Sequence, residues 1–452
     1  MRMTAGEITR ICGGKLLCGD PNTVVTSVST DSRKIDIGTL FVPIKGERTN
    51  AHTFIEATFA AGASATLTQE HDRMDDRHAW IRVHSTEQAL QQIAAAYRRK
   101  FSIPFIGITG SVGKTTTKEM VALVLSAGWN VMKTEGNFNS QIGLPLTLFS
   151  LNKKHQAAVI EMGMSNFGEM GRLAQIAAPD YAIVTNIGIS HIEHLKTQQN
   201  IMSEKLHITD CFHKDSVLFL NGDDPLLAQL RHTEQYRVVW FGTQPWCDFR
   251  AENVRMEDTS ARFTLASPQG EYEVHLPAPG MHNVTNALAG LAVAAVLGRP
   301  LQKAIAKLAE YRPLAMRQQI HRVNEVTVID DSYNASPDAI RSSVDVLCSF
   351  HTGKRIAVLA DMLELGDYSQ KAHFDVGAYT ASAGVDVLVT VGERAKDIAS
   401  GAQSVHPELP CFSFDDNSEA IQKLKALLTQ GDAVLVKGSR GMKTDQIVKA
   451  LL

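Results

Sequence analysis

A glycine-rich segment at residues 107–116, GITGSVGKTT, contains the residue types that bind nucleotide phosphates. It follows an apolar run and precedes a helical pattern, so its backbone N–H groups and the helix N-terminus can hold phosphate oxygens. Lys114 is expected to reach the terminal phosphates, and the Thr115 hydroxyl is expected to bind Mg²⁺. Ile108 replaces the first glycine of the usual GxxxxGK[ST] spacing, which leaves the shorter form TGxxGK[ST]. The residues predicted to bind the nucleotide here are Gly110, Ser111, Val112, Gly113, Lys114, Thr115 and Thr116.

Two later strand-like runs end in polar groups that suit a bound cation. Glu161 closes the run AAVIE, and Asn186 closes YAIVTN, with His191 five residues further on. Because ligands of open parallel sheets bind beyond the carboxyl ends of the strands, we expect these groups to converge on the cation at the phosphate loop. Taken singly, Glu161 could equally cap a helix and His191 could equally be an ordinary loop residue.

The elements that must position these groups divide into three α/β sets. Residues 1–100 mix short strand-like runs, such as 38–44, with helical patterns, which predicts a small α/β domain. Residues 101–312 contain short buried strands with helical crossovers, then alternating strands and a helix at 283–297, as in a doubly wound central domain. Residues 313–452 contain a second series of βα units, so a third α/β domain is expected.

The overall composition is that of a globular enzyme. The 452 residues are 44% hydrophobic and 21% charged, with a formal net charge of −3 and no long basic block, which disfavours binding to nucleic acid or an anionic membrane. The six cysteines are too far apart for a zinc motif or a dense disulfide framework. No apolar run is long enough for a signal peptide or a membrane span, so a cytoplasmic location is expected.

Composition and spacing thus indicate an ATP- or GTP-using enzyme with a Mg²⁺ site, and they do not identify the acceptor. At this point the chain resembles the Mur ligases. The resemblance rests on TGSVGKTT, EMG, the N-x-x-x-x-H spacing and SEKLHI in the centre, STDSRK and GTLFVPIKGERTNAH before it, and MHNVTNALAG, DDSYNASPDAI and VKGSR after it. It implies a UDP-precursor-binding domain, a central P-loop ATPase domain and a C-terminal Rossmann-like domain that binds the incoming dipeptide.

Within the family, GNFNSQIGLPLTL and EMGMSNFGEM resemble the members that add D-alanyl-D-alanine. No motif like the DNPR of the diamino-acid-adding members is present. The resemblance implies an ATP-dependent ligase, acting as a monomer, that joins D-alanyl-D-alanine to UDP-N-acetylmuramoyl-tripeptide through an acyl phosphate in peptidoglycan precursor synthesis. The alternatives are a diamino-acid-adding ligase, a folylpolyglutamate synthetase, or a nucleotide-sensing module that forms no bond.

The resemblance also assigns roles to residues that spacing alone does not. It implies that Lys205 is carbamylated by CO₂ and holds a second Mg²⁺ together with His191, so the expected catalytic residues are Lys114, His191 and Lys205, and the expected metal ligands are Thr115, Glu161, His191 and Lys205. An exposed helical lysine is the alternative for Lys205. It further implies nucleotide contacts from Asn283, Asn286, Arg317 and Asp331, although both asparagines could instead cap a helix.

The remaining residues carried over are those expected to bind the substrates. The implied UDP-precursor contacts are Asp31, Ser32, Arg33, Lys45 and Gly46, and the implied muramoyl contacts are Asn137 and Asn139. The proposed dipeptide contacts are Asn334, Lys437 and Arg440, for which surface salt bridging is the alternative at the two cations. One departure from the family pattern is Ala51, which stands before His52 where relatives often have glycine.

Overall fold

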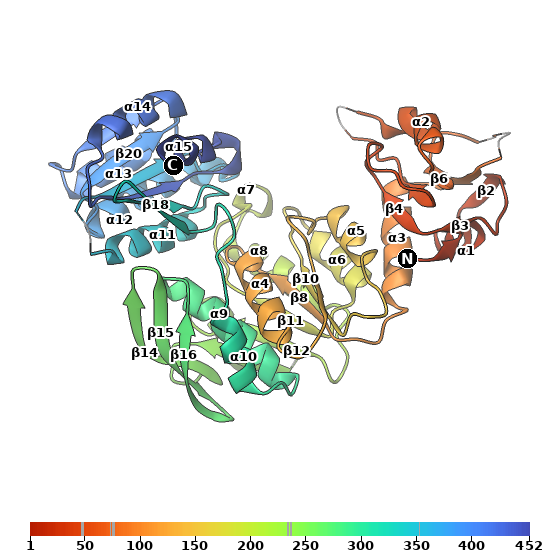
Figure 1. Ribbon diagram of the computed structural model, residues 1–452, viewed down its shortest axis with the longest axis horizontal. Helices are drawn as coiled ribbons and strands as arrows, with labels where there is room; N and C mark the ends of the chain where they lie inside the picture. Colours follow the sequence, from red (N-terminus) through yellow and green to blue (C-terminus); the bar gives the residue numbers. More distant parts are fainter. Residues whose placement is uncertain (47–48, 73, 75–76, 233–234, 236, 352) are drawn as a thin grey trace.

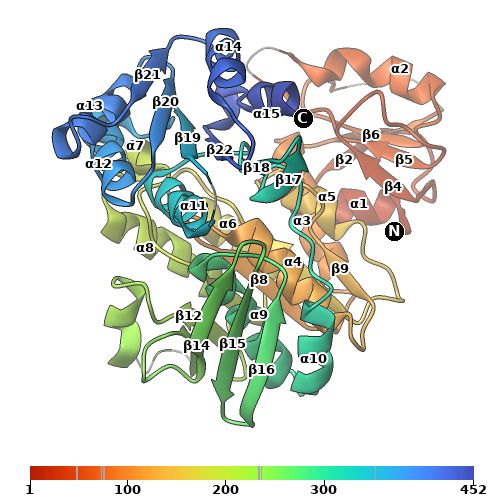
Figure 2. The ribbon, with the colours of Figure 1, turned by 60° about the vertical axis from the view of Figure 1, so that its left-hand side comes forward.

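The computed structural model describes residues 1–46, 49–72, 74, 77–232, 235, 237–351 and 353–452. The chain forms three α/β domains, each built on its own sheet, with the first and third domains on the same side of the central one (Figure 1 and Figure 2). The mixed α/β fold class expected from the pattern of strands and helices is confirmed. No helix among the described residues is long and apolar enough to cross a membrane.

The first domain has a five-stranded sheet in the order β2-β7-β6-β5-β4. The strand expected at 38–44 is shorter, because Pro43 has no N–H to donate and its carbonyl oxygen accepts a hydrogen bond from the Thr86 hydroxyl instead (2.6 Å). The elements are β1 (Met3–Thr4), α1 (Ala5–Ile11), β2 (Lys15–Cys18), β3 (Val24–Val25), β4 (Ser27–Ser29), β5 (Thr39–Phe41), η1 (Ala51–Phe54), α2 (Ile55–Ala60), β6 (Ala65–Thr68), β7 (Ala79–Arg82) and α3 (Thr86–Arg98).

The central domain has a nine-stranded sheet in the order β16-β15-β14-β13-β12-β11-β8-β10-β9. Strands β8 to β14 are parallel, and β15 and β16 extend the sheet in antiparallel pairs. From β8 the chain goes first to β9 and β10 on one side and then to β11 on the other. The carboxyl end of β8 is therefore a topological switch point, which is where open α/β sheets bind ligands.

The bounds of the central elements agree with the expected order of strands and helices. The helix expected at 283–297 is α9, which begins two residues earlier after Gly280 and is buried along most of its length. The strands are β8 (Phe105–Thr109), β9 (Val131–Lys133), β10 (Ala157–Glu161), β11 (Tyr181–Val184), β12 (Val217–Asn221), β13 (Arg237–Gly242), β14 (Phe249–Glu257), β15 (Ser260–Ser267) and β16 (Gly270–Leu276). The helices are α4 (Lys114–Leu125), α5 (Gly143–Leu148), α6 (Glu169–Ala177), α7 (Ile192–Leu195), α8 (Gln198–Leu206), η2 (His207–Thr209), η3 (Leu227–His232), α9 (Met281–Val296) and α10 (Leu301–Leu308).

The third domain has a six-stranded sheet in the order β17-β18-β22-β19-β20-β21, parallel except for the edge strand β17. Because β18 and β22 are neighbours, the residues at their carboxyl ends meet although they are about a hundred positions apart. The elements are β17 (Gln319–Val323), β18 (Val326–Asp330), α11 (Pro337–Ser349), β19 (Arg355–Ala360), η4 (Gly366–Tyr368), α12 (Ser369–Ser382), β20 (Val387–Val391), α13 (Lys396–Val405), β21 (Cys411–Phe414), α14 (Asn417–Leu427), β22 (Ala433–Lys437), η5 (Arg440–Met442) and α15 (Asp445–Leu451).

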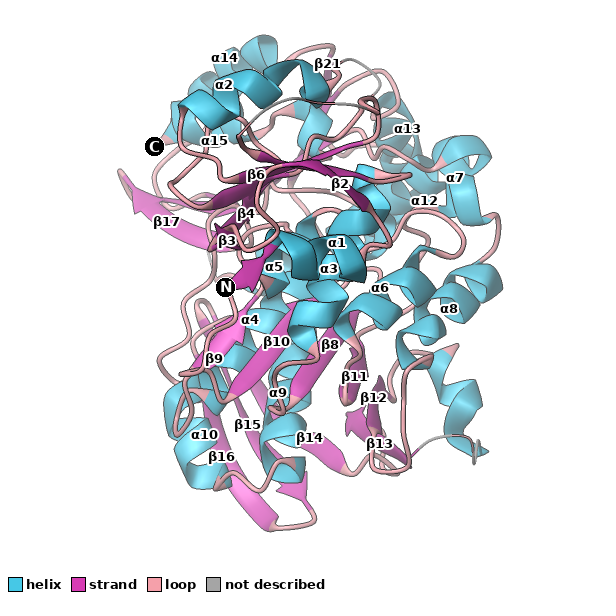
Figure 3. Cartoon of the chain, turned by 90° about the vertical axis from the view of Figure 1, so that its right-hand side faces the viewer, coloured by secondary structure: helices cyan, strands magenta, loops and turns pink. Residues whose placement is uncertain are grey.

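The first and central domains share an apolar interface. Helix α3 packs against α5 and α6, and all three lie between the sheet of the first domain and the central sheet (Figure 3). Buried side chains such as Leu90, Leu144 and Leu173 belong to one continuous core there. Burial of this apolar surface holds the amino end of α3 beside the carboxyl ends of the central strands.

Candidate active site

A cavity of about 650 Å³ lies at the carboxyl end of β8, within the size range of small-molecule sites. All three domains contribute to its lining: Glu87 from α3, the phosphate loop from Ser111 to Thr116, and Asp331 after β18. The switch point of the central sheet therefore faces the ends of the third domain's strands across one continuous space.

The phosphate loop is held in a tight turn between β8 and α4. Gly110 has a φ of 148°, and a Cβ there would lie 1.8 Å from the Thr185 hydroxyl oxygen, so no side chain fits at this position. The Lys114 ammonium donates hydrogen bonds to the carbonyl oxygens of Gly110 (2.8 Å) and Ser111 (3.3 Å). Burial lowers the pKa of Lys114, with the Arg317 charge acting in the same direction and Glu161 opposing it. The Lys114 side chain thus folds back onto the backbone of the phosphate loop and lines the cavity.

Asn186 braces the phosphate loop. Its side-chain oxygen accepts a hydrogen bond from the Val112 N–H (2.8 Å), and its carbonyl oxygen accepts one from the Ser111 N–H (3.1 Å). Asn186 lines the cavity, and its side-chain oxygen supports the loop that would hold the nucleotide. Spacing placed Asn186 at the correct strand end but could not show which group it contacts.

Glu161 and Thr115 form a buried oxygen-rich cluster at the floor of the cavity. Glu161 Oε1 accepts hydrogen bonds from the Thr115 hydroxyl (3.2 Å) and the Asn139 amide (2.8 Å). Glu161 Oε2 has no hydrogen-bond partner among the described residues, and the Lys118 ammonium lies 3.8 Å from it. This buried oxygen thus has an ion pair with Lys118 but no hydrogen bond, so it can accept a further positively charged ligand. Because hard cations prefer hydroxyl and carboxylate oxygens, these residues fit Mg²⁺.

The described part of the chain contains no group of three or more His, Cys, Asp or Glu side chains arranged for a metal ion. A cation beside Thr115 and Glu161 therefore depends on other oxygens as well, such as those of phosphate and water. This is the usual arrangement for Mg²⁺, which keeps several waters and binds through one or two carboxylates together with substrate phosphates.

Lys205 lies in α8 with only 2% of its surface exposed. Among the described residues its ammonium has no hydrogen-bond or ion-pair partner. The neighbouring carboxylate of Glu204 instead accepts hydrogen bonds from the N–H groups of Gly168 and Met170, both at 2.9 Å. Burial, and next the charge of Lys114, place the pKa of Lys205 well below its ordinary value. The exposed-lysine alternative is therefore wrong, although Lys205 is not part of the cavity lining itself.

His191 lines the cavity and connects the central and third domains. It has a positive φ of 63°, and its Nδ1 lies 2.7 Å from Glu364 Oε2 in a contact that is not well aligned as a hydrogen bond. Contact with His191 lowers the pKa of the Glu364 carboxyl. Nearby, the Tyr368 hydroxyl donates to the Lys196 carbonyl oxygen (3.2 Å), so the segment around α7 meets the third domain (Figure 1).

The four residues expected at the nucleotide's other end all line the same cavity. Asn286 lies inside α9, where it accepts a hydrogen bond from the Thr117 hydroxyl (3.0 Å) and is not a helix cap. Asn283 donates to the Pro279 carbonyl oxygen (2.7 Å) and to Gln318. The Arg317 guanidinium lies 4.1 Å from the Tyr333 ring centroid. Cations favour aromatic faces at such a distance, so Arg317 is oriented at the cavity wall.

Lys437 and Asp331 form a buried ion pair in the third domain. Lys437 Nζ lies 2.5 Å from Asp331 Oδ2, and Lys437 is only 3% exposed. The surface-salt-bridge alternative for Lys437 is therefore wrong, because the pair is buried where β18 and β22 end side by side. Asn334 lines the cavity, whereas Arg440 is exposed outside the lining, with Nη1 3.6 Å from Met316 Sδ.

The residues expected to bind the UDP end lie in the first domain, outside the cavity lining. The Arg33 guanidinium donates two hydrogen bonds to the Asp31 carboxylate, each 2.9 Å, which lowers the pKa of Asp31 to about 2. Ser32 lies between them in the same turn, Lys45 pairs with Glu70, and the Gly46 N–H donates to Thr49. Glu47 and Arg48 of the motif GTLFVPIKGERTNAH lie outside the described residues. Asn137 and Asn139, by contrast, line the cavity.

Tyr333 and Asp338 are among the lining residues that were not selected from the sequence. Both belong to the quoted motif DDSYNASPDAI, from which only Asp331 and Asn334 were selected, so proximity to that motif was the available signal. Tyr333 orients Arg317 through its ring face. Burial raises the pKa of Asp338, with Asp224 acting in the same direction and Arg341 opposing it.

Comparison with known protein families matches all three domains. The matches are the Mur ligase family catalytic domain at residues 24–98, the Mur ligase middle domain at 108–294, and the Mur ligase glutamate ligase domain at 316–440. A curated relative, the UDP-N-acetylmuramoyl-tripeptide–D-alanyl-D-alanine ligase of Bacillus subtilis, is 37% identical over 433 residues, which cover 95% of this chain and 94% of the relative.

Solved structures agree with these matches. A MurF crystal structure from Acinetobacter baumannii has a TM-score of 0.93 at 30% identity and covers 100% of this chain and 99% of that one. The MurF ligase of Thermotoga maritima in complex with ADP has a TM-score of 0.85 at 28% identity, covering 94% and 97% of the two chains. With relatives similar along nearly the whole chain and each of the three domains matched, this protein belongs to the Mur ligase family.

Proposed function

We propose that the protein is an ATP-dependent ligase that joins D-alanyl-D-alanine to UDP-N-acetylmuramoyl-tripeptide and releases ADP and phosphate. The observation that carries this proposal is the single cavity in which the phosphate loop, the Thr115–Glu161 cluster and the strand ends of the third domain meet. The names of the relatives supply the substrates, since the cavity by itself does not select them. This activity contributes to peptidoglycan synthesis, and with it to cell shape and division.

The reaction has two steps that both place negative charge on oxygen. A carboxylate oxygen of the tripeptide attacks the γ-phosphorus of ATP, the bond to the β–γ bridging oxygen breaks, and an acyl phosphate and ADP form. The amine of D-alanyl-D-alanine then attacks the acyl carbon, loses a proton, and expels phosphate. Lys114 and the N–H groups of the phosphate loop stabilise the charge on the transferred phosphoryl group. Thr115 and Glu161 would hold Mg²⁺, which would supply further charge compensation when bound.

Lys205 serves as a carbamate in this proposal. Its neutral amine attacks CO₂ and loses a proton, which gives a carbamate whose carboxylate would hold a second Mg²⁺ together with His191. The lowered pKa of Lys205 supports this step, because only the neutral amine reacts. The absence of a described partner for the ammonium also supports it, since a buried unpaired cation is unfavourable.

The substrates are divided among domains 1–100, 101–312 and 313–452. The first binds the UDP end through Asp31, Ser32, Arg33, Lys45 and Gly46; the central domain binds ATP and the muramoyl end, with Asn137 and Asn139 at the latter. Asn283, Asn286, Arg317 and Asp331 bind the nucleoside and phosphates between the second and third domains. Asn334, Lys437 and Arg440 receive the dipeptide. In this proposal the protein acts as a monomer in the cytoplasm.

The proposal predicts the fate of one oxygen atom. With ¹⁸O in the terminal carboxylate of the tripeptide, one ¹⁸O should appear in the released phosphate, because the acyl C–O bond breaks when the amine attacks. Mass spectrometry of the peptide product and the phosphate measures this directly. Product from glutamate or a diamino acid with its own acceptor, and none from D-alanyl-D-alanine, would favour another ligase of the superfamily. ATP hydrolysis without any peptide product would favour a nucleotide-sensing module.

Glu161→Gln should raise the Mg²⁺ concentration for half-maximal activity by about tenfold or more, because an amide is a weaker ligand for a hard cation than a carboxylate. The substitution keeps the size of the side chain and leaves an oxygen to accept from Thr115 and Asn139. Titration of activity with Mg²⁺ at saturating ATP measures the shift. Glu408→Gln, at an exposed position far along the third domain, is the matched control. An unchanged Mg²⁺ dependence in a folded Glu161→Gln protein would exclude Glu161 as a ligand.

A further inference from the structure

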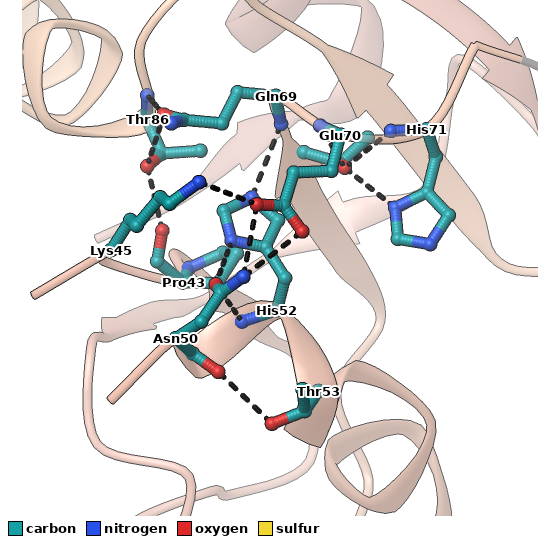
Figure 4. Close-up of polar contacts among 10 residues, drawn as sticks. Pro43, Lys45, Asn50, His52, Thr53, Gln69, Glu70, His71 and Thr86 are labelled. Atoms are coloured by element: carbon teal, nitrogen blue, oxygen red, sulfur yellow. Dashed lines mark hydrogen bonds and ion pairs between the residues drawn. The ribbon is translucent and has the colours of Figure 1, made fainter. Parts of the chain in front are cut away.

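A closed set of hydrogen bonds surrounds His52 in the first domain, away from the ATP cavity. It joins the loop after β5, the segment after β6 and the start of α3 (Figure 4). His52 is only 5% exposed, whereas 60% of the Lys45 side chain on the same loop is exposed. The buried imidazole therefore supports the loop, and the exposed ammonium is the group able to meet a ligand.

The bonds form a ring that begins and ends on the segment after β5. The Thr86 hydroxyl donates to the Pro43 carbonyl oxygen (2.6 Å), and the Thr86 N–H donates to Gln69 Oε1 (2.9 Å). The Gln69 N–H donates to His52 Nε2 (3.2 Å), and His52 Nδ1 lies 2.9 Å from Asn50 Oδ1. An antiparallel bridge between Lys45 and Asn50 closes the ring.

This geometry defines the protonation state of His52. A backbone N–H can only donate, so Nε2 must be the acceptor and Nδ1 must carry the proton that goes to Asn50 Oδ1. The orientation of the Asn50 amide is consistent with this, because Oδ1 also accepts from the His52 N–H (3.1 Å) and Nδ2 donates to the Glu70 carboxylate (2.9 and 3.1 Å). His52 is therefore neutral when the ring is intact.

Burial and the neighbouring charges together lower the pKa of His52, although the largest charge effect, that of Glu70, raises it. Burial is the largest cause that lowers the pKa of His52 below its ordinary 6.5, and the neighbouring His71, Lys45 and Arg82 add to it, while Glu70 opposes them. The imidazole is thus neutral above pH 6.5. As the pH falls below that value and through the lowered pKa, a proton on Nε2 removes the acceptor for Gln69 and opens the ring.

The ring also controls the surroundings of Lys45. Asn50, held by His52, donates to the same Glu70 carboxylate that lies 3.4 Å from the Lys45 ammonium. Loss of the hydrogen bond from His52 would leave the Asn50 side chain free to move. The Lys45–Asn50 bridge would then weaken, and Glu70 would lose the amide that holds it in place. His52 is therefore coupled to Lys45 through two residues without touching any ligand itself.

We infer that His52 is a positioning residue that keeps the loop bearing Lys45 and Gly46 in the shape that receives the diphosphate of the UDP substrate. The inference rests on the proposed function. An exposed ammonium suits a diphosphate, which carries negative charge. The Gly46 N–H donates to the Thr49 carbonyl oxygen (3.0 Å) and so supports the loop instead. The ion pair with Glu70 restrains the Lys45 ammonium, while 60% of the Lys45 side chain remains exposed to solvent and can meet the diphosphate.

The test compares binding of UDP-N-acetylmuramoyl-tripeptide and of ADP by calorimetry in the full-length protein. His52→Leu should raise the Kd of the UDP substrate about tenfold and leave the Kd of ADP and kcat at saturation within about twofold. His52→Gln, which restores an acceptor for the Gln69 N–H, should recover part of the loss and keeps the test valid if the leucine variant does not fold. His71→Gln is the matched control, because His71 lies on the segment after β6 but takes no part in the ring of hydrogen bonds.

Two further measurements separate positioning from a general loss of structure. In a Lys45→Ala background, His52→Leu should change the Kd by less than about twofold, because its effect passes through Lys45. Below pH 6.5, the Kd of the UDP substrate should rise more steeply for the wild-type protein than for His52→Gln, which lacks the imidazole. Wild-type affinity in a folded His52→Leu protein, or a full effect in the Lys45→Ala background, would overturn the inference. Failure of the wild-type protein to bind the UDP substrate at all would instead refute the proposed function.

Discussion

Replacing Lys114 with alanine should lower kcat by about 10³-fold or more, because the substitution removes the cation that stabilises the transferred phosphoryl group. The lysine donates only to the carbonyl oxygens of its own loop, at Gly110 and Ser111, so its loss should leave the fold intact. ADP release in the presence of all three substrates measures the rate, and thermal unfolding measures the stability. The expected result is a folded protein with nearly no turnover.

Two comparisons make the Lys114 result specific. Lys114→Arg keeps the positive charge but replaces a compact ammonium with a planar fork, so it should stay well below the wild-type rate. Lys153→Ala, at an exposed position of the central domain, should have no effect. A folded Lys114→Ala protein that turns over at the wild-type rate would remove Lys114 from the mechanism.

Lys205→Ala should lower kcat by about 10²-fold or more, and small carboxylates such as acetate should restore part of the activity, because they can occupy the position of the lost carbamate. In wild-type protein equilibrated with ¹³C-bicarbonate, NMR should detect a carbamate carbon that Lys205→Ala lacks. The lowered pKa of Lys205 determines the pH dependence. The neutral amine predominates above that pKa, so carbamylation should decline as the pH falls through it.

Lys214→Ala provides the matched control, because Lys214 is exposed and lies outside the cavity lining. It should keep wild-type activity, show the carbamate signal and gain nothing from acetate. Absence of the ¹³C signal in the wild-type protein, together with no rescue of Lys205→Ala, would show that Lys205 acts as an ordinary buried lysine.

The sequence predicted those elements well whose structure depends on residues next to one another in the chain. A buried strand, a glycine turn and a helix in direct succession specify a phosphate loop, so Gly110 to Thr116 could be identified without knowing the rest of the fold. Glu161 could be selected because the carboxyl ends of parallel strands share one edge of the sheet. The ends of elements were less accurate, as at 38–44, where the contact between Pro43 and Thr86 ends the strand early.

Which partner each polar group takes was decided by the tertiary structure. Asn186 turns to the phosphate loop, Lys437 pairs with Asp331, and His191 meets Glu364, in each case across more than seventy positions of the chain. Such pairs depend on strand order and on how the domains meet, and neither is encoded in local spacing. Lys205 illustrates the same limit, since burial of its ammonium follows from the packing of α8 and not from its neighbours in sequence.

By itself, then, the sequence determined the three α/β domains, the phosphate loop and the carboxylate beside it, because short-range order and the side-chain period of strands and helices specify these features. Only the tertiary structure decided the protonation of His52, the burial of Lys205 and the pairing of Lys437 with Asp331. These states depend on burial and on charges brought together from distant segments, and the free energy of a buried charge is determined by its whole surroundings.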